Sequence, residues 1–142
     1  MVYFVGAGPR AANLITMRDT ELLKKADVII YAGSLVNPAL LDYAGEKCAI
    51  HNSASMTLDE VTDIMEKHHD DIVVRLHTGD PCIYGAIREQ MDILDLKRII
   101  IRVSAGCQFV YRCRRGAKRR IYTPGSKSKR HSDAHGGAYP CT

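Results

Sequence analysis

Two short apolar runs of this chain end directly in glycine loops, and this pairing constrains the fold more than any other feature. Residues 2–5 run into Gly-Ala-Gly-Pro at 6–9, and residues 72–76 run into His-Thr-Gly-Asp-Pro at 77–81. Glycine permits positive φ values and lets a flat ligand approach the backbone. In an open α/β sheet, ligands bind beyond the carboxyl ends of the strands. Two such loops therefore predict a site for a nucleotide-like ligand.

The apolar runs alternate with segments of helical periodicity. Within one of these segments, Thr57 and Glu60 match a capping box. Alternating strands and helices predict an α/β fold, with a mostly parallel sheet and helices on both faces. The predicted strands are 2–5, 27–31, 48–50 and 72–76, with 99–101 as a fifth, and the predicted helices are 20–26, 38–43, one beginning after Thr57, and 85–95.

Charge divides the chain into two parts. Residues 1–96 hold eight lysines and arginines and 15 acidic residues, a net charge of −7. Residues 97–142 hold 12 lysines and arginines and one aspartate, a net charge of +11. Helical and strand periodicity also stops after the fifth predicted strand, and such a composition buries too little apolar surface to offset its ordering entropy. We therefore predict an incomplete α/β domain over 1–96 and an irregular basic tail over 97–142.

Two other nucleotide sites fit the loops poorly. Residues 6–11 match the degenerate dinucleotide pattern GxGxxA, but the second predicted strand ends Tyr-Ala-Gly at 31–33, without the acid that would hold a ribose. Pro9 also removes a backbone N–H where a pyrophosphate needs one. No GxxxxGK[ST] pattern is present, which excludes a P-loop.

Histidines and cysteines give weaker signals. His-His-Asp-Asp at 68–71 resembles a metal site, but it ends a predicted surface helix, where histidines suit the negative helix terminus. The five cysteines form no C-x-x-C pair, which favours free thiols in the cytoplasm, and Cys82 is expected to be a small packed residue. No apolar run approaches about 18 residues, so no membrane contact is expected.

Three segments together resemble the tetrapyrrole (corrin/porphyrin) methylase family. They are Gly-Ala-Gly-Pro at 6–9 with Leu-Ile-Thr at 14–16, the segment 26–36 containing Tyr-Ala-Gly-Ser-Leu-Val, and the segment 75–87 containing His-Thr-Gly-Asp-Pro and Tyr-Gly. The last two segments separate the chain from the uroporphyrinogen-III methylases. The resemblance covers residues 1 to about 96.

The resemblance implies two α/β domains, of which this chain would hold the first, with S-adenosyl-methionine in the cleft between them. It implies methyl transfer to carbon 11 of precorrin-4 or cobalt-precorrin-4, a polycarboxylate tetrapyrrole for which Arg75 and Arg88 are the cations to consider. It also implies a homodimer in the intact family. By motif position, the cofactor contacts would be Pro9, Thr78, Gly79, Asp80 and Ile83, with Tyr84 close to the macrocycle.

Two positions depart from the family pattern. Arg10 stands at the second glycine of the Gly-Pro-Gly loop, where a charged side chain could crowd the cleft. Asp19 stands where the family usually has glycine. Unimpaired cofactor binding is therefore in question for this chain.

The basic tail has a second interpretation, because a shifted reading frame restores family-like sequence. Back-translating residues 110–125 and reading one base later gives Phe-Ile-Ala-Ala-Ala-Ala-Ala-Leu-Lys-Glu-Glu-Tyr-Thr-Leu-Pro-Gly. We expect a frame slip between about residues 95 and 105, which resequencing of the locus would test, and a fragment inactive as a methyltransferase. The alternative is a small protein whose basic tail binds nucleic acid, with steep salt dependence.

Overall fold

A parallel sheet of five strands carries the two glycine loops. The computed structural model describes residues 1–83, 87–104 and 106. The strand order is β3-β2-β4-β1-β5, and each neighbouring pair is parallel, which confirms the α/β prediction. The strands are β1 (Val2–Gly6), β2 (Val28–Tyr31), β3 (Ala49–Asn52), β4 (Val73–His77) and β5 (Ile101–Ser104); the α-helices are α1 (Met17–Lys25), α2 (Leu58–Lys67) and α3 (Arg88–Leu96); the 3-10 helices are η1 (Ala12–Leu14), η2 (Gly33–Leu35), η3 (Pro38–Tyr43) and η4 (Ser53–Ser55).

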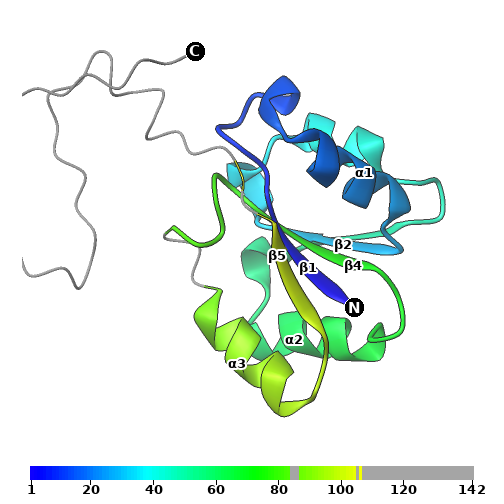
Figure 1. Ribbon diagram of the computed structural model, residues 1–142, viewed down its shortest axis with the longest axis vertical. Helices are drawn as coiled ribbons and strands as arrows, with labels where there is room; N and C mark the ends of the chain where they lie inside the picture. Colours follow the sequence, from blue (N-terminus) through cyan, green and yellow to red (C-terminus); the bar gives the residue numbers. More distant parts are fainter. Residues whose placement is uncertain (84–86, 105, 107–142) are drawn as a thin grey trace, which may run out of the picture.

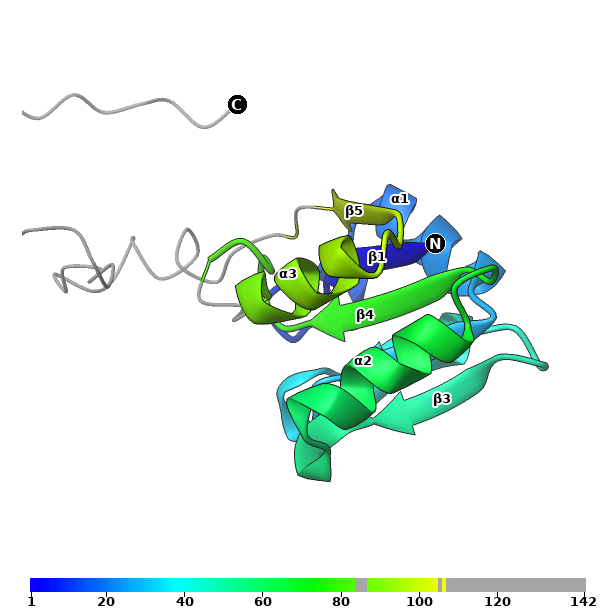
Figure 2. The same ribbon diagram turned by 90° about the horizontal axis from the view of Figure 1, so that it is seen from below.

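Helices cover both faces of the sheet, as the sequence predicted (Figure 1). Leu23 of α1 and Leu40 of η3 pack over one face. On the other face α2 and α3 lie side by side (Figure 2), and Met65 and Leu94 bring them into one apolar cluster with Phe4. A strand buried on both faces must be apolar at successive positions, which explains the continuous runs of β1 and β4.

The connections leaving β1 and β4 diverge. β1 continues through α1 to β2 over one face, whereas β4 continues through α3 to β5 over the opposite face. β1 and β4 are neighbours, paired from Val2–Val73 to Gly6–His77. Where neighbouring parallel strands send their loops to opposite faces, a ligand crevice is expected at their carboxyl ends. Both glycine loops flank this position, which we call the crevice.

Side-chain caps set the starts of α1 and α2. The predicted capping box is confirmed: the Glu60 amide donates to Thr57 Oγ1 at 3.2 Å, and the Thr57 amide donates to Glu60 Oε2 at 2.7 Å. α1 begins three residues before the predicted start because Thr16 Oγ1 accepts from the Asp19 amide at 3.2 Å.

Among the described residues, no helix is long and apolar enough to cross a membrane.

The sheet continues beyond the boundary predicted at residue 96. β5 lies at residues 101–104, two residues later than predicted, and pairs with β1 from Val2–Ile101 to Val5–Ser104. It starts late because the backbone and side chain of Ile99 are used to end α3. The predicted tail from residue 107 onward lies outside the described residues.

α3 ends in a Schellman motif that has arginine in place of glycine. The Ile99 amide donates to the Leu94 carbonyl at 3.0 Å, and the Arg98 amide donates to the Asp95 carbonyl at 3.0 Å. Ile99 and Leu94 also pack in the same cluster, the apolar contact that accompanies this motif. Arg98 supplies the left-handed residue, with φ 55°. A Cβ in this conformation costs about 1–2 kcal/mol.

Replacing Arg98 with glycine should therefore stabilise the fold. We expect Arg98→Gly to raise the free energy of unfolding by about 0.5–1 kcal/mol, since the relieved strain exceeds the extra chain entropy of glycine. The matched control is Arg88→Gly at helical φ in the same helix, which should lower stability by a similar amount. Urea unfolding measures both, and a destabilised Arg98→Gly would contradict this account.

Candidate functional site: the crevice between the β1 and β4 loops

Backbone hydrogen bonds join the two glycine loops beyond the ends of their strands. The Ala7 amide donates to the His77 carbonyl at 2.6 Å. Gly8 and Gly79 then form an antiparallel bridge, in which the Gly79 amide donates to Gly8 O at 3.0 Å and the Gly8 amide to Gly79 O at 3.4 Å. The two loops recognised from sequence therefore form one structural unit.

Glycine is required at this junction on steric grounds. Gly8 and Gly79 have φ values of 69° and 64°. A Cβ on Gly6 would touch the Gly79 carbonyl oxygen and lie 2.5 Å from Gly106 Cα. Three backbone segments, which follow β1, β4 and β5, thus meet without side chains between them. The sequence reasoning missed Gly106 because its partners lie far away along the chain.

Most of the predicted cofactor residues lie along this edge. Gly79 is buried in the bridge, Pro9 and Asp80 are half-buried, and Thr78 and Ile83 are exposed. The junction therefore brings Pro9 together with the segment 78–80 at the carboxyl edge of the sheet. Tyr84, predicted to lie near the macrocycle, falls outside the described residues.

Asp80 shapes the turn that follows Gly79. Its Oδ1 accepts from the Cys82 amide at 2.8 Å, and its carbonyl accepts from the Ile83 amide at 3.0 Å. Cys82 itself is exposed, so the prediction of a packed thiol is wrong: this turn presents the side chain to solvent. Partial burial and the neighbouring Asp80 carboxylate raise the pKa of the Cys82 thiol. The residue is therefore poorly suited to act as a nucleophile.

A family profile identifies the architecture. The profile of the Tetrapyrrole (Corrin/Porphyrin) Methylases matches residues 1–110. This chain belongs to the tetrapyrrole methylase family. The cobalt-precorrin-4 C(11)-methyltransferase of Methanocaldococcus jannaschii is 48% identical over 112 residues, which are 78% of this chain and 43% of that protein. The precorrin-4 C(11)-methyltransferase of Pseudomonas aeruginosa is 43% identical over 94 residues, 63% of this chain and 36% of that protein.

Solved structures of tetrapyrrole methylases share the fold. The cobalt precorrin-4 methyltransferase CbiF superposes with a TM-score of 0.72 at 36% identity, covering 78% of this chain and 47% of that one. The uroporphyrin-III C-methyltransferase of Thermus thermophilus complexed with S-adenosyl homocysteine superposes with a TM-score of 0.63 at 30% identity, covering 75% and 45%. The chain thus spans less than half the length of these relatives.

Arg75 has a structural role that the sequence did not reveal. It is buried below the crevice, on the face covered by α2 and α3. Its Nη1 donates to Ser53 Oγ at 2.8 Å and to the Ile30 carbonyl at 3.4 Å, and its Nε donates to Gln90 Oε1 at 3.3 Å. The guanidinium therefore ties β4 to β2, η4 and α3. It is not presented as a surface cation for a macrocycle.

His77 lies beside Arg75 on the same face of β4. Its ring stacks on Phe4 with centroids 6.1 Å apart, and its Nε2 is buried without a hydrogen-bond partner in the structure. Burial, and then the positive charge of Arg75, lower the pKa of His77 to about 4. The imidazole is therefore neutral at physiological pH.

The family-pattern departure at Asp19 adds an uncompensated polar group beneath α1. The side chain is fully buried; Oδ2 accepts from Thr16 Oγ1 at 2.6 Å, whereas Oδ1 has no partner in the structure. Burying such a group without a hydrogen bond costs free energy. The departure at Arg10 is different, because this residue is exposed and has φ 67°.

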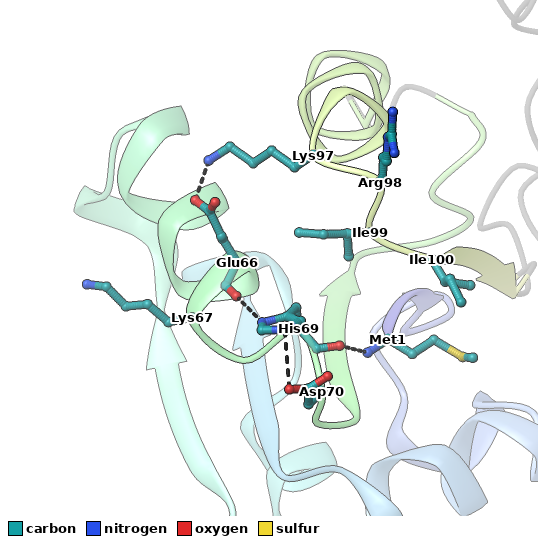
Figure 3. Close-up of a pocket in the computed structure, with 9 residues that line it drawn as sticks. All are labelled: Met1, Glu66, Lys67, His69, Asp70, Lys97, Arg98, Ile99 and Ile100. Carbon is teal, nitrogen blue, oxygen red and sulfur yellow. Dashed lines mark hydrogen bonds and ion pairs between the residues drawn. The ribbon is translucent and has the colours of Figure 1, made fainter.

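A cavity of about 630 Å³ lies at the opposite, amino edge of the sheet (Figure 3). Some of its polar groups are engaged with one another: Lys97 Nζ lies 2.5 Å from Glu66 Oε2, and the Met1 amine donates to the His69 carbonyl at 2.6 Å. His69 Nδ1 lies 3.0 Å from the Glu66 carbonyl in the last turn of α2, the helix-end role predicted from sequence. Within the described part of the chain, no cluster of three His, Cys, Asp or Glu side chains could hold a metal.

A side chain at Gly6 should break the three-segment junction. Because its Cβ would meet backbone atoms, Gly6→Ala should lower the free energy of unfolding by about 1–3 kcal/mol. Gly45→Ala is the matched control, since its Cβ would meet nothing nearer than the Lys24 carbonyl at 3.7 Å, and a change within about 0.5 kcal/mol is expected. Equal unfolding curves for the two variants would refute the proposed crowding.

His77 should make the fold sensitive to acid. Its pKa is about 4 in the folded chain and 6.5 as a free group, so the unfolded state binds protons more readily between these values. Stability due to His77 is complete above pH 6.5 and is lost as the pH falls, by about 2 kcal/mol between pH 6.5 and 5. Urea unfolding at both pH values should show this loss in the natural chain and a smaller one in His77→Gln. An identical loss in both chains would exclude His77 as its cause.

Proposed function

We propose that this chain carries the cofactor-binding half of a methyltransferase that uses S-adenosyl-methionine to methylate carbon 11 of precorrin-4 or cobalt-precorrin-4. The observation that carries the proposal is the Gly8–Gly79 bridge, which joins the two motif loops at the switch point of the sheet. Relatives that match these motifs at 48% and 43% identity are C(11)-methyltransferases.

The glycine loops support this assignment. Because Gly8 and Gly79 carry no side chains, the two loops pair closely at the edge where the cofactor would bind. Pro9, Thr78 and Ile83 would flank the methionine and ribose parts, and Asp80 would hold the ribose while its turn fixes the loop. The Thermus relative has been solved in complex with S-adenosyl homocysteine, which supports a cofactor of this kind.

The protein would contribute alignment rather than a nucleophile. When bound, the cofactor supplies a methyl group on a sulfonium, which an electron-rich carbon of the macrocycle can attack. The glycine loops would orient that group, and the second wall of the cleft, implied by the family resemblance, would exclude water. Tyr84 would lie close to the macrocycle. The homodimer also stays a prediction.

We further propose that residues 97–142 include an out-of-frame translation, which accounts for the charge reversal after residue 96. β5 supports a slip late in the expected range of about 95–105, since this strand still completes the sheet. Residues read out of frame would not form the second wall of the cleft that the family resemblance implies. We therefore propose that this chain is inactive as an isolated methyltransferase.

A chimera tests the proposed function independently of the tail. Residues 1–96 would replace the matching segment of the M. jannaschii relative, and methyl transfer from radiolabelled S-adenosyl-methionine to the tetrapyrrole would be measured. We expect turnover, because the transplanted segment contains both loops of the crevice. Gly79→Val in the chimera should abolish cofactor binding, whereas Gly45→Val should not. A folded chimera that binds no S-adenosyl-homocysteine would overturn the proposal.

A further inference from the structure

A ligand that carries carboxylates needs a cationic partner at the crevice. Arg75 and Arg88, the two candidates from the sequence, are engaged elsewhere. Arg75 is buried in its own hydrogen-bond network. Arg88 is exposed on α3, where its Nε lies 2.9 Å from Asp92 Oδ1. Residues 1–96 otherwise carry a net charge of −7, which would repel an anionic ligand.

Arg10 lies directly at the crevice, two residues beyond the Gly8–Gly79 bridge. Its amide donates to the Gly8 carbonyl at 3.0 Å, and its carbonyl accepts from Asn37 Nδ2 at 2.7 Å. Asn37 is itself fixed, because its Oδ1 accepts from the Ala39 amide at 3.0 Å. The backbone of Arg10 is therefore held between the loops that follow β1 and β2.

The conformation of Arg10 is strained. Its φ of 67° is left-handed, a region that costs a residue with a Cβ about 1–2 kcal/mol. Glycine would adopt it without that cost. Strained residues held by their surroundings concentrate at functional sites. The hydrogen bonds that hold this strained backbone also fix the Cα of Arg10 beside the crevice.

The guanidinium of Arg10 is available for a ligand. The side chain is exposed, and among the described residues it forms no ion pair with a carboxylate. A guanidinium presents a planar fork of donors that matches both oxygens of a carboxylate. An arginine at this rim therefore suits a carboxylate better than it suits any neutral group.

We propose that Arg10 is a binding residue of the crevice that pairs with a carboxylate of the bound ligand. This inference rests on the proposed function, which offers two sources: the amino-acid part of the cofactor and the acidic rim of the tetrapyrrole. A charged side chain at this position would favour anionic ligands over neutral ones.

The experiment is a titration of the full ¹⁵N-labelled chain, followed by the amide shifts of Gly8 and Gly79. Three probes separate the sources: S-adenosyl-homocysteine, methylthioadenosine, which lacks the amino-acid carboxylate, and uroporphyrin, a polycarboxylate macrocycle. Because residues 97–142 hold 12 lysines and arginines, uroporphyrin also meets charge elsewhere, so only shifts at the crevice count.

The variants are Arg10→Gly, Arg10→Lys and Arg98→Gly. Arg98 is the matched control, since it is also an exposed arginine with positive φ but lies near the amino edge of the sheet. Arg10→Gly should weaken the binding of a carboxylate probe about five- to tenfold, and Arg10→Lys should weaken it less. Arg98→Gly should bind each probe with the affinity of the natural chain. Weakening of S-adenosyl-homocysteine alone assigns the contact to the cofactor, and weakening of uroporphyrin alone assigns it to the macrocycle.

Other results overturn the proposal. Unchanged binding in Arg10→Gly, or an equal loss in Arg98→Gly, would show that Arg10 makes no specific contact. Methylthioadenosine tests the proposed function separately from the role of Arg10. Because it lacks the carboxylate, it can bind the crevice without pairing with a cation. If methylthioadenosine shifts the amide signals of Gly8 and Gly79 while the binding of no probe depends on Arg10, the crevice is a binding site and the role of Arg10 is refuted. If no probe shifts these amides, neither proposal holds for this chain.

Discussion

The bridge between Gly8 and Gly79 is the interaction on which the rest of the site depends. It prolongs the pairing of β1 and β4 into the loops, so that the crevice has a floor made of main chain. Had either loop carried side chains here, the segments after β1, β4 and β5 could not approach one another. The same few glycines therefore let three backbone segments close together at the carboxyl edge of the sheet.

β4 supports this site from below as well as forming one edge of it. Its side chains alternate between faces, which places Arg75 and His77 together under α2 and α3. The buried guanidinium donates to a strand carbonyl, a hydroxyl and a side-chain amide oxygen. Burial, and then the charge of this guanidinium, lower the pKa of His77 and keep its imidazole neutral. Polar groups buried in this way favour one arrangement of loops, because displacing any partner leaves a donor without an acceptor.

Local sequence patterns predicted the layers and most elements, since hydrophobic periodicity and caps act over a few residues. Thr57 with Glu60 is such a signal, and so are the apolar runs of β1 and β4. Apart from Cys82, which a local turn exposes, the errors came from contacts over long sequence separations. From the sequence, Arg75 is taken for a surface cation; only its hydrogen bonds to Ser53 and Gln90 show that it is a buried structural residue. The role of Gly106 likewise depends on its contact with Gly6. Thr78 and Asp80 lie at the predicted edge, although their contacts with a ligand stay a prediction.

The position of β1 inside the sheet has a consequence for how the chain assembles. β1 is synthesised before the other strands of the described sheet, yet within this sheet it pairs only with β4 and β5, the last two. β2 and β3 can pair earlier, but they cannot cover Val2 or Phe4. The apolar β1 segment therefore remains unpaired until Val73 and its neighbours have left the ribosome. Such late, long-range closure slows folding and gives chaperones a defined segment to protect.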